Sequence, residues 1–202
     1  MTDRNELEYF HIGGSFGGNQ DWFLEPTMHF GGCGAAAACD ASICLAMYQG
    51  KSGMIPFVPE ELTRRVYVSF AMKMKPYLSP RWSGINTLEI FMEGFSRYMD
   101  DAGVDGVAMK GFSGSGEEAA AEKIIARQID AGIPIPYLVL YHRDPALKDF
   151  RWHWFLLTGY EKKKDVFSVK TATYGEARWF PLHQLWDTGY EEKGGMILLS
   201  VE

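Results

Sequence analysis

The sequence predicts an α+β fold, in which a group of helices packs against an antiparallel β-sheet. Two observations indicate this: apolar residues recur at helical spacing up to residue 132, and short β-branched and aromatic runs separated by turn residues follow. Because the two kinds of segment do not alternate along the chain, a parallel sheet built from β–α–β units is not expected. The length of 202 residues suits a single domain covering 1–202.

Four helices are expected in the first part of the chain. A run of alanines and apolar residues favours the first helix, and the sequence QGKSG ends it. In the fourth helix, Ser115 is the expected N-cap, and Glu117 and Glu118 suit the positive end of the helix dipole. Residues 1–32 are rich in glycine turns and look irregular. The expected helices cover 34–48, 59–78, 85–103 and 113–132, with a short strand at 104–112.

Strands are expected in the last third of the chain, where aromatic and β-branched residues gather in short runs. The sequence EKKKD between two of these runs is read as a solvated hairpin turn centred on Lys163. The expected strands cover 133–142, 153–161, 166–174 and 194–202.

Charge and composition argue against several kinds of partner. The formal net charge is −6 and no basic patch with interleaved aromatic residues occurs, so no nucleic-acid partner is expected. The sequence holds no run of eighteen apolar residues and no signal-peptide pattern, so no membrane partner is expected and the cytoplasm is the expected location.

Three cysteines, Cys33, Cys39 and Cys44, lie within twelve residues. They project around one predicted helix, so they do not form a disulfide framework. Their spacings of six and five lack the paired C-x-x-C pattern of zinc sites. We therefore expect no metal and no other cofactor, and a reducing compartment fits the free thiols.

The setting of Cys33 favours a nucleophile. It follows two glycines in the sequence HFGGCGAAAACDASICLAM and falls in the first turn of the predicted helix. Unpaired backbone N–H groups and the helix dipole stabilise a thiolate at such a position. Glycines on both sides, including Gly32, leave room for a substrate carbonyl. The alternative is a small residue used for close helix packing.

A thiol nucleophile needs a base, and His153 is the candidate. It opens the predicted strand HWFLLTGYE, a position rigid enough to hold a catalytic imidazole. The alternative for His153 is a hydrogen-bonded histidine at a strand end. His29, four residues before Cys33, is a weaker candidate for the base.

Three segments, in this order, resemble papain-like cysteine peptidases: GGCGAAAACDASICLAM, AGIPIPYLVLYH and HWFLLTGYE. The greatest similarity is to the bacterial branch related to bacteriocin double-glycine leader peptidases. The resemblance covers residues 17–48 and 130–200. It implies a papain-like fold, with a nucleophile helix and a helical subdomain packed on a C-terminal antiparallel sheet.

The resemblance also implies roles for individual residues. Cys33 matches the nucleophile and His153 the general base that forms a thiolate–imidazolium pair with it. Gln20, in GGNQDWF, is the candidate for the side-chain amide that joins the Cys33 N–H in binding the oxyanion. The alternative for Gln20 is a plain surface glutamine.

The third member of the family's triad, an Asn or Asp, is missing. With the hairpin centred on Lys163, Thr173 faces His153 directly and Thr171 is the diagonal neighbour on the same sheet face. A threonine hydroxyl can accept the Nδ1–H bond of the imidazole, but as a neutral acceptor it stabilises imidazolium less than Asp does. Glu176, just past the strand, is a possible substitute.

The substrate cleft is expected beside Cys33 and His153. Residues 51–115 are expected to form a helical insertion that makes one wall of it. Four tryptophans are candidates to line the cleft: Trp22, Trp152, Trp154 and Trp179.

Together these features predict a cytoplasmic bacterial cysteine hydrolase that acts on a peptide or other amide through an acyl-enzyme. Two alternatives stay open. The same thioester can pass its acyl group to an amine, which would make the protein an acyltransferase. A catalytically inactive, peptidase-like module that binds peptides is the other.

Overall fold

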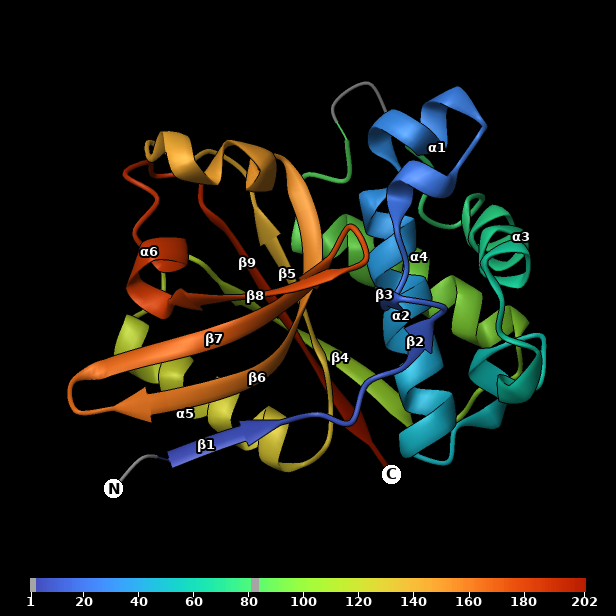
Figure 1. Ribbon diagram of the computed structural model, residues 1–202, viewed down its shortest axis with the longest axis horizontal. Helices are drawn as coiled ribbons and strands as arrows, with labels where there is room; N and C mark the ends of the chain where they lie inside the picture. The colour runs from blue at the N-terminus through green and yellow to red at the C-terminus, as the bar shows by residue number, and fades with distance from the viewer. Residues whose placement is uncertain (1–2, 81–83) are drawn as a thin grey trace.

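The computed structural model describes residues 3–80 and 84–202. It confirms the α+β class: a seven-stranded antiparallel sheet has helices on both faces (Figure 1). The sheet runs in the order β4 (Val107–Ser113), β9 (Gly194–Val201), β5 (Ile135–Val139), β6 (His153–Lys163), β7 (Val166–Thr173) and β8 (Glu176–Pro181). β1 (Asp3–Glu6) pairs with the second half of β6, and β2 (His11–Ile12) and β3 (Ser15–Phe16) form a separate small hairpin.

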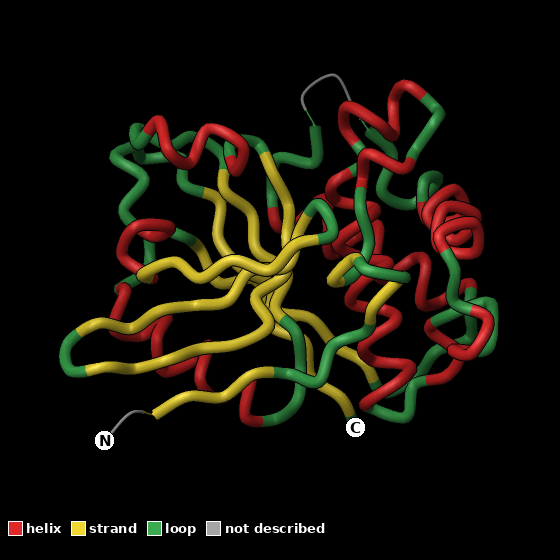
Figure 2. The backbone as a smooth tube through the Cα atoms, viewed as in Figure 1, coloured by secondary structure: helices red, strands yellow, loops and turns green. Residues whose placement is uncertain are grey.

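The helices divide between the two faces of the sheet. In Figures 1 and 2 the group that contains α2 lies to the right of the sheet, on the side opposite α5 and α6. The helices are α1 (Pro26–Gly31), α2 (Cys33–Tyr48), α3 (Arg64–Met74), α4 (Leu88–Asp101), α5 (Glu118–Asp130) and α6 (Leu182–Trp186). Short 3₁₀ turns cover Gln20–Trp22, Ser52–Met54, Pro59–Glu61 and Pro145–Phe150.

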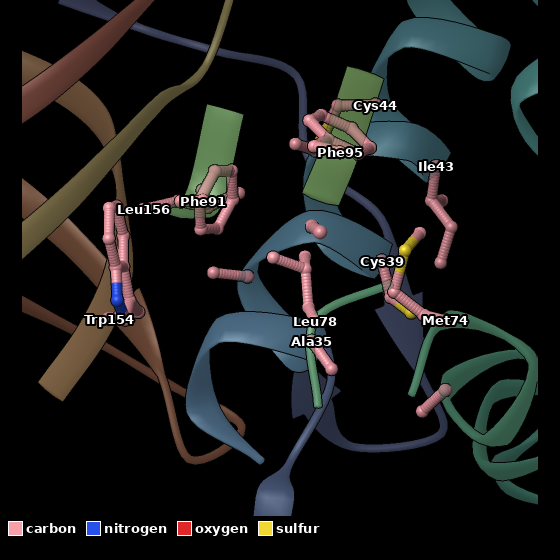
Figure 3. Close-up of a cluster of buried hydrophobic side chains, with 14 of the residues drawn as sticks. Ala35, Cys39, Ile43, Cys44, Met74, Leu78, Phe91, Phe95, Trp154 and Leu156 are labelled. Atoms are coloured by element: carbon pink, nitrogen blue, oxygen red, sulfur yellow. The ribbon is translucent and has the colours of Figure 1, made fainter. Parts of the chain in front are cut away.

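Two hydrophobic cores follow from this layering. Trp154 and Leu156 of β6 point into the core that contains α2, α3 and α4, while Phe155 and Leu157 point into the core with α5 and α6. Helix α2 is buried on nearly all sides because its alanines are small enough for neighbours to approach every face. Figure 3 shows Cys39 and Cys44 of α2 inside the first core.

Several expected element boundaries are wrong. The fourth helix begins at Glu118 with Glu117 as its N-cap, so Ser115 does not cap it. Residues 1–32 are less irregular than expected, because β1 pairs with the far end of β6 and Pro26 starts a short helix. β8 and α6 were not expected from the sequence.

The segment 51–115 is only partly helical. Its helices α3 and α4 lie within the expected ranges, and the short strand expected at 104–112 is β4, at Val107–Ser113, an edge strand of the sheet paired with β9. The helical part of the segment therefore ends at Asp101, and residues 81–83 lie outside the described part of the chain.

The predicted register of the β6–β7 hairpin is also wrong. Lys163 pairs with Val166, so the turn is Lys164–Asp165 rather than a turn centred on Lys163. An irregularity between Leu157 and Gly159 then shifts the pairing by one residue. As a result Thr171 faces Leu157, four residues from the expected histidine.

Among the residues that the structure describes, no helix is long and apolar enough to cross a membrane.

Candidate active site

Cys33 is the first residue of the sixteen-residue helix α2. A side chain at the N-cap, Gly32, would collide with the Met28 carbonyl, so this glycine allows α1 and α2 to meet closely. Cys33 as a residue is partly buried, and its thiol faces the start of β6, where Sγ lies 3.9 Å from the carbonyl oxygen of Trp152. The helix start therefore presents the sulfur to the residue that precedes His153.

The protein environment favours the neutral thiol of Cys33. Burial raises its pKa above the ordinary value of 9.0, although the backbone N–H groups of Trp154, Gly34 and Cys33 itself act to lower it. The thiolate expected at this helix start is thus supported by N–H donors but opposed by a larger desolvation cost.

His153 opens β6 opposite Val139 of β5 and is buried. Its ring is surrounded by aromatic rings: Tyr174 is stacked on it with centroids 4.7 Å apart, and Phe150 and Phe155 lie 6.3 and 6.2 Å away. This burial lowers the pKa of His153 to about 4. Burial therefore favours a neutral thiol and a neutral imidazole, not the thiolate–imidazolium pair that the resemblance implies.

Thr173 contacts His153 as the sequence predicts, although the register behind the prediction is wrong and the ring nitrogen contacted is Nε2, not the expected Nδ1. Its Oγ1 lies 2.7 Å from His153 Nε2. The Tyr174 hydroxyl lies 3.5 Å from Nδ1, but the two rings are within 3° of parallel, so this hydroxyl lies above the imidazole plane, away from the nitrogen's lone pair. Thr173 is thus the hydrogen-bond partner of Nε2. Among the described residues, Nδ1 has no partner in the plane of the ring.

The other candidates for the third position do not reach the imidazole. The Thr171 hydroxyl is buried and donates to the Arg178 carbonyl at 3.2 Å. Glu176 accepts from the Arg178 side chain at the surface.

Gln20 is a buried residue, not the surface glutamine of the alternative interpretation. Its Nε2 donates to the His29 carbonyl at 2.7 Å, which fixes the side-chain amide. Its Oε1 is buried without a hydrogen-bond partner among the residues that the structure describes. Because an amide nitrogen carries two protons, one N–H of Gln20 remains for a ligand oxygen.

These residues meet in one place. A cavity of about 20 Å³, room for about one water molecule, is lined by Cys33, Gln20 and His153 together with Asp40, Thr173 and Tyr174. Residues 120 positions apart in the chain, Cys33 and His153, are therefore neighbours of a single cavity. The structure thus brings together a thiol, an imidazole with an oriented ring and a fixed amide.

The four tryptophans do not line a single cleft. Trp154 lines the cavity but is a core residue: it is buried, stacks on Phe91 at 4.3 Å and donates to the Ile85 carbonyl at 2.6 Å (Figure 3). Trp152 is 42% exposed and lines a groove of about 350 Å³. Trp22 packs edge-on against Tyr67. Trp179 lies on β8 under the Arg4 guanidinium.

Sequence reasoning missed Asp40 and Tyr174. A signal for Asp40 was present, because it is a lone charged residue inside the apolar helical run CDASICLAM. Tyr174 has a positive φ of 52° just after Thr173, which no sequence pattern indicated. His29 lies in the last turn of α1, and its backbone carbonyl, not its ring, contacts a site residue by accepting from Gln20 Nε2.

Within the described ranges, no group of three or more His, Cys, Asp or Glu side chains is arranged to hold a metal ion. Comparison of the chain with protein-family models, with curated proteins and with solved structures finds no match.

Proposed function

We propose that this protein is a papain-like cysteine hydrolase that cleaves a peptide or other amide bond through an acyl-enzyme on Cys33. One observation carries the proposal: the thiol at the start of α2 shares a small cavity with an oriented histidine and a fixed glutamine amide. Nucleophile, base and oxyanion donors are the groups that acyl transfer requires.

The buried setting indicates how the proton moves. Since burial favours the neutral pair, His153 accepts the Sγ proton on Nδ1 as the sulfur attacks the carbonyl carbon. A C–S bond forms, and the carbonyl electron pair moves to the oxygen, which the Cys33 N–H and a Gln20 N–H stabilise. When the C–N bond breaks, His153 gives the proton to the leaving amine. Water then releases the acyl group from the sulfur.

Thr173 orients the base in this mechanism. With Nε2 held by the Thr173 hydroxyl, the proton-accepting role falls to Nδ1. The hydroxyl is a neutral acceptor, so it orients the imidazolium while stabilising its charge less than a carboxylate does.

Two grooves beside the cavity offer room for an extended substrate. One, of about 450 Å³, shares Thr173 and Tyr174 with the cavity, and the other, of about 350 Å³, includes Trp152, whose carbonyl faces the sulfur. Two grooves of this size next to residues of the cavity suit a substrate chain that continues past the scissile bond, which favours a peptide. The three free thiols support a reducing compartment such as the cytoplasm.

The test is incubation of the protein with a proteome-derived peptide mixture in ¹⁸O-labelled water, read by mass spectrometry. The proposal expects new carboxyl termini that carry ¹⁸O, their loss in Cys33→Ala, and their retention in Cys39→Ala, which removes a buried thiol of the same helix.

Other outcomes of this experiment decide against hydrolysis. Cys33-dependent amide adducts in place of ¹⁸O incorporation would identify an acyltransferase. Peptides retained unchanged by both the wild type and Cys33→Ala would identify an inactive binding module.

A further inference from the structure

A buried carboxylate lies two turns beyond Cys33 on α2. Asp40 is 5% exposed and accepts hydrogen bonds from three donors. The Tyr9 hydroxyl donates to Oδ2 at 2.8 Å, the Tyr67 hydroxyl to Oδ1 at 2.7 Å, and the Gly18 backbone N–H lies 3.2 Å from Oδ2. Asp40 thus joins the N-terminal segment, α3 and the glycine loop to the nucleophile helix.

The glycine pair in the sequence SFGGNQ, Gly17 and Gly18, makes this contact sterically possible. A Cβ at Gly17 would lie 2.7 Å from Asp40 Oδ2, and one at Gly18 would collide with the Tyr67 ring. Gly17 also has a φ of +75°, which L side chains rarely adopt. The backbone can therefore approach the carboxylate only because both residues lack side chains.

The loop at Gly18 connects both to Gln20 and to the turn that follows the ring stacked on His153. In one direction, Gln20 follows two residues later and is held by the His29 carbonyl. In the other, the Gly18 carbonyl accepts from the Gly175 N–H at 3.0 Å, and the Phe16 N–H donates to the Gly175 carbonyl at 2.8 Å. Gly175 follows Tyr174, the ring stacked on His153, and in Figure 1 this β7–β8 turn reaches toward α2.

Stability alone does not account for Asp40. An ionised carboxylate loses its hydration in the core, and an apolar residue of similar size would avoid that cost. Two of the three donors, Gly18 and Tyr67, line the cavity, and so does Asp40 itself.

We infer that Asp40 is a positioning residue that fixes the Gly17–Gly18 loop, and through it the Gln20 amide, for oxyanion stabilisation at Cys33. The inference rests on the proposed function. It assigns Asp40 no contact with substrate. The loop is the connection between the helix that carries the nucleophile and the turn that covers the base.

Two reactions of Cys33 separate this role from a structural one. Acetylation by p-nitrophenyl acetate passes through an oxyanion, whereas alkylation by iodoacetamide is a displacement at carbon without one. We expect Gln20→Ala to slow Cys33 acetylation by about 10²-fold or more and Asp40→Asn by at least about tenfold, with alkylation changed less than about twofold in each. The double variant should be no slower than Gln20→Ala alone, because both changes act on one group.

Two further variants keep the test decisive. Tyr67→Phe removes one donor to Asp40 while keeping the ring, and it should lower acetylation selectively even if Asp40→Asn folds poorly. Ser42→Ala, a buried polar position on the same helix, should change neither reaction.

The outcomes separate this inference from the function on which it rests. If Gln20→Ala slows acetylation but Asp40→Asn and Tyr67→Phe do not, the inference is wrong and the function stands. Parallel loss of acetylation and alkylation in the Asp40 and Tyr67 variants also overturns it, because it indicates a general structural role. If wild type and Gln20→Ala acetylate Cys33 equally, the oxyanion role itself fails.

Discussion

The hydroxyl of Thr173 lies 2.7 Å from Nε2 of His153. The contact orients the ring, but it brings no charge to a histidine that is enclosed by aromatic rings. Desolvation lowers the pKa of His153 to about 4, and the neutral hydroxyl adds no charge that would raise it.

Replacing Thr173 by Asp should activate Cys33 at lower pH. A charge-assisted bond to imidazolium is worth roughly 1.5–3 kcal/mol against about 1 kcal/mol for a neutral one, which raises the pKa of His153 and with it the thiolate fraction. The measurement is the rate of Cys33 alkylation against pH, with Thr173→Val as the variant that removes the acceptor. Identical pH profiles of alkylation for Thr173→Asp and Thr173→Val would show that the side chain at position 173 does not influence the base.

In the wild type, alkylation of Cys33 should rise with pH through 7 and 8 without an acidic plateau. Burial raises the pKa of the thiol above 9.0 and lowers that of His153 to about 4, so thiol and imidazole are both neutral between these values. Iodoacetamide alkylation followed by peptide mapping gives the profile, and N-acetylcysteine is the reference thiol. A plateau already reached at pH 5–6 would instead demonstrate the ion pair.

The unfolding free energy of the wild type, relative to that of Asp40→Asn, should fall as pH rises from 4 to 7. Burial raises the pKa of Asp40 from 3.8 to about 6, so between these values the folded state binds more protons than the unfolded chain. The stability that this group contributes is present below pH 4 and is lost as pH passes 6. Urea unfolding at several pH values should show a relative change on the order of 3 kcal/mol.

The matched comparison for that experiment is Ser42→Ala, which has no titrating group. Its stability difference from the wild type should stay constant over the same pH range. A wild type that gains stability relative to Asp40→Asn toward neutral pH would contradict the assignment of a raised pKa.

Trp154 and Trp152 are near neighbours in sequence and should differ sharply in their contribution to stability. Trp154→Ala should cost about 3–5 kcal/mol, because the ring is buried against Phe91 and its N–H donates to the Ile85 carbonyl. Trp152→Ala should cost less than about 1 kcal/mol, since its ring is 42% exposed. Urea unfolding of both variants measures this, and equal losses would contradict the core role of Trp154.

The elements predictable from sequence were those with strong local signals. The alanine run of α2, the periodic apolar residues of α4 and the aromatic run of β6 specify their own secondary structure, and all three were expected. β1 was not predictable because it is held by pairing with β6, more than 150 residues later. A four-residue polar strand carries no local signal of its own.

The candidate site was predictable in its residues more than in its geometry. Cys33, His153 and Gln20 were identified from motifs, and the structure places them around one cavity. The hairpin register was not predictable, since the irregularity between Leu157 and Gly159 depends on how β1 and β7 both meet β6. The role of the glycine pair also required the structure, because Asp40 and Tyr67 approach it from other elements.

The burst of p-nitrophenolate from p-nitrophenyl acetate shows whether Cys33 and His153 act as a nucleophile–base pair. We expect one acetyl group per chain, mapped to Cys33, and a burst that His153→Ala slows by about 10²–10⁴-fold. His142→Ala, which changes a buried histidine bonded to the Gln184 carbonyl, should leave the burst unchanged. Acetylation spread over other residues, or an equal burst in His153→Ala and wild type, would contradict the claim.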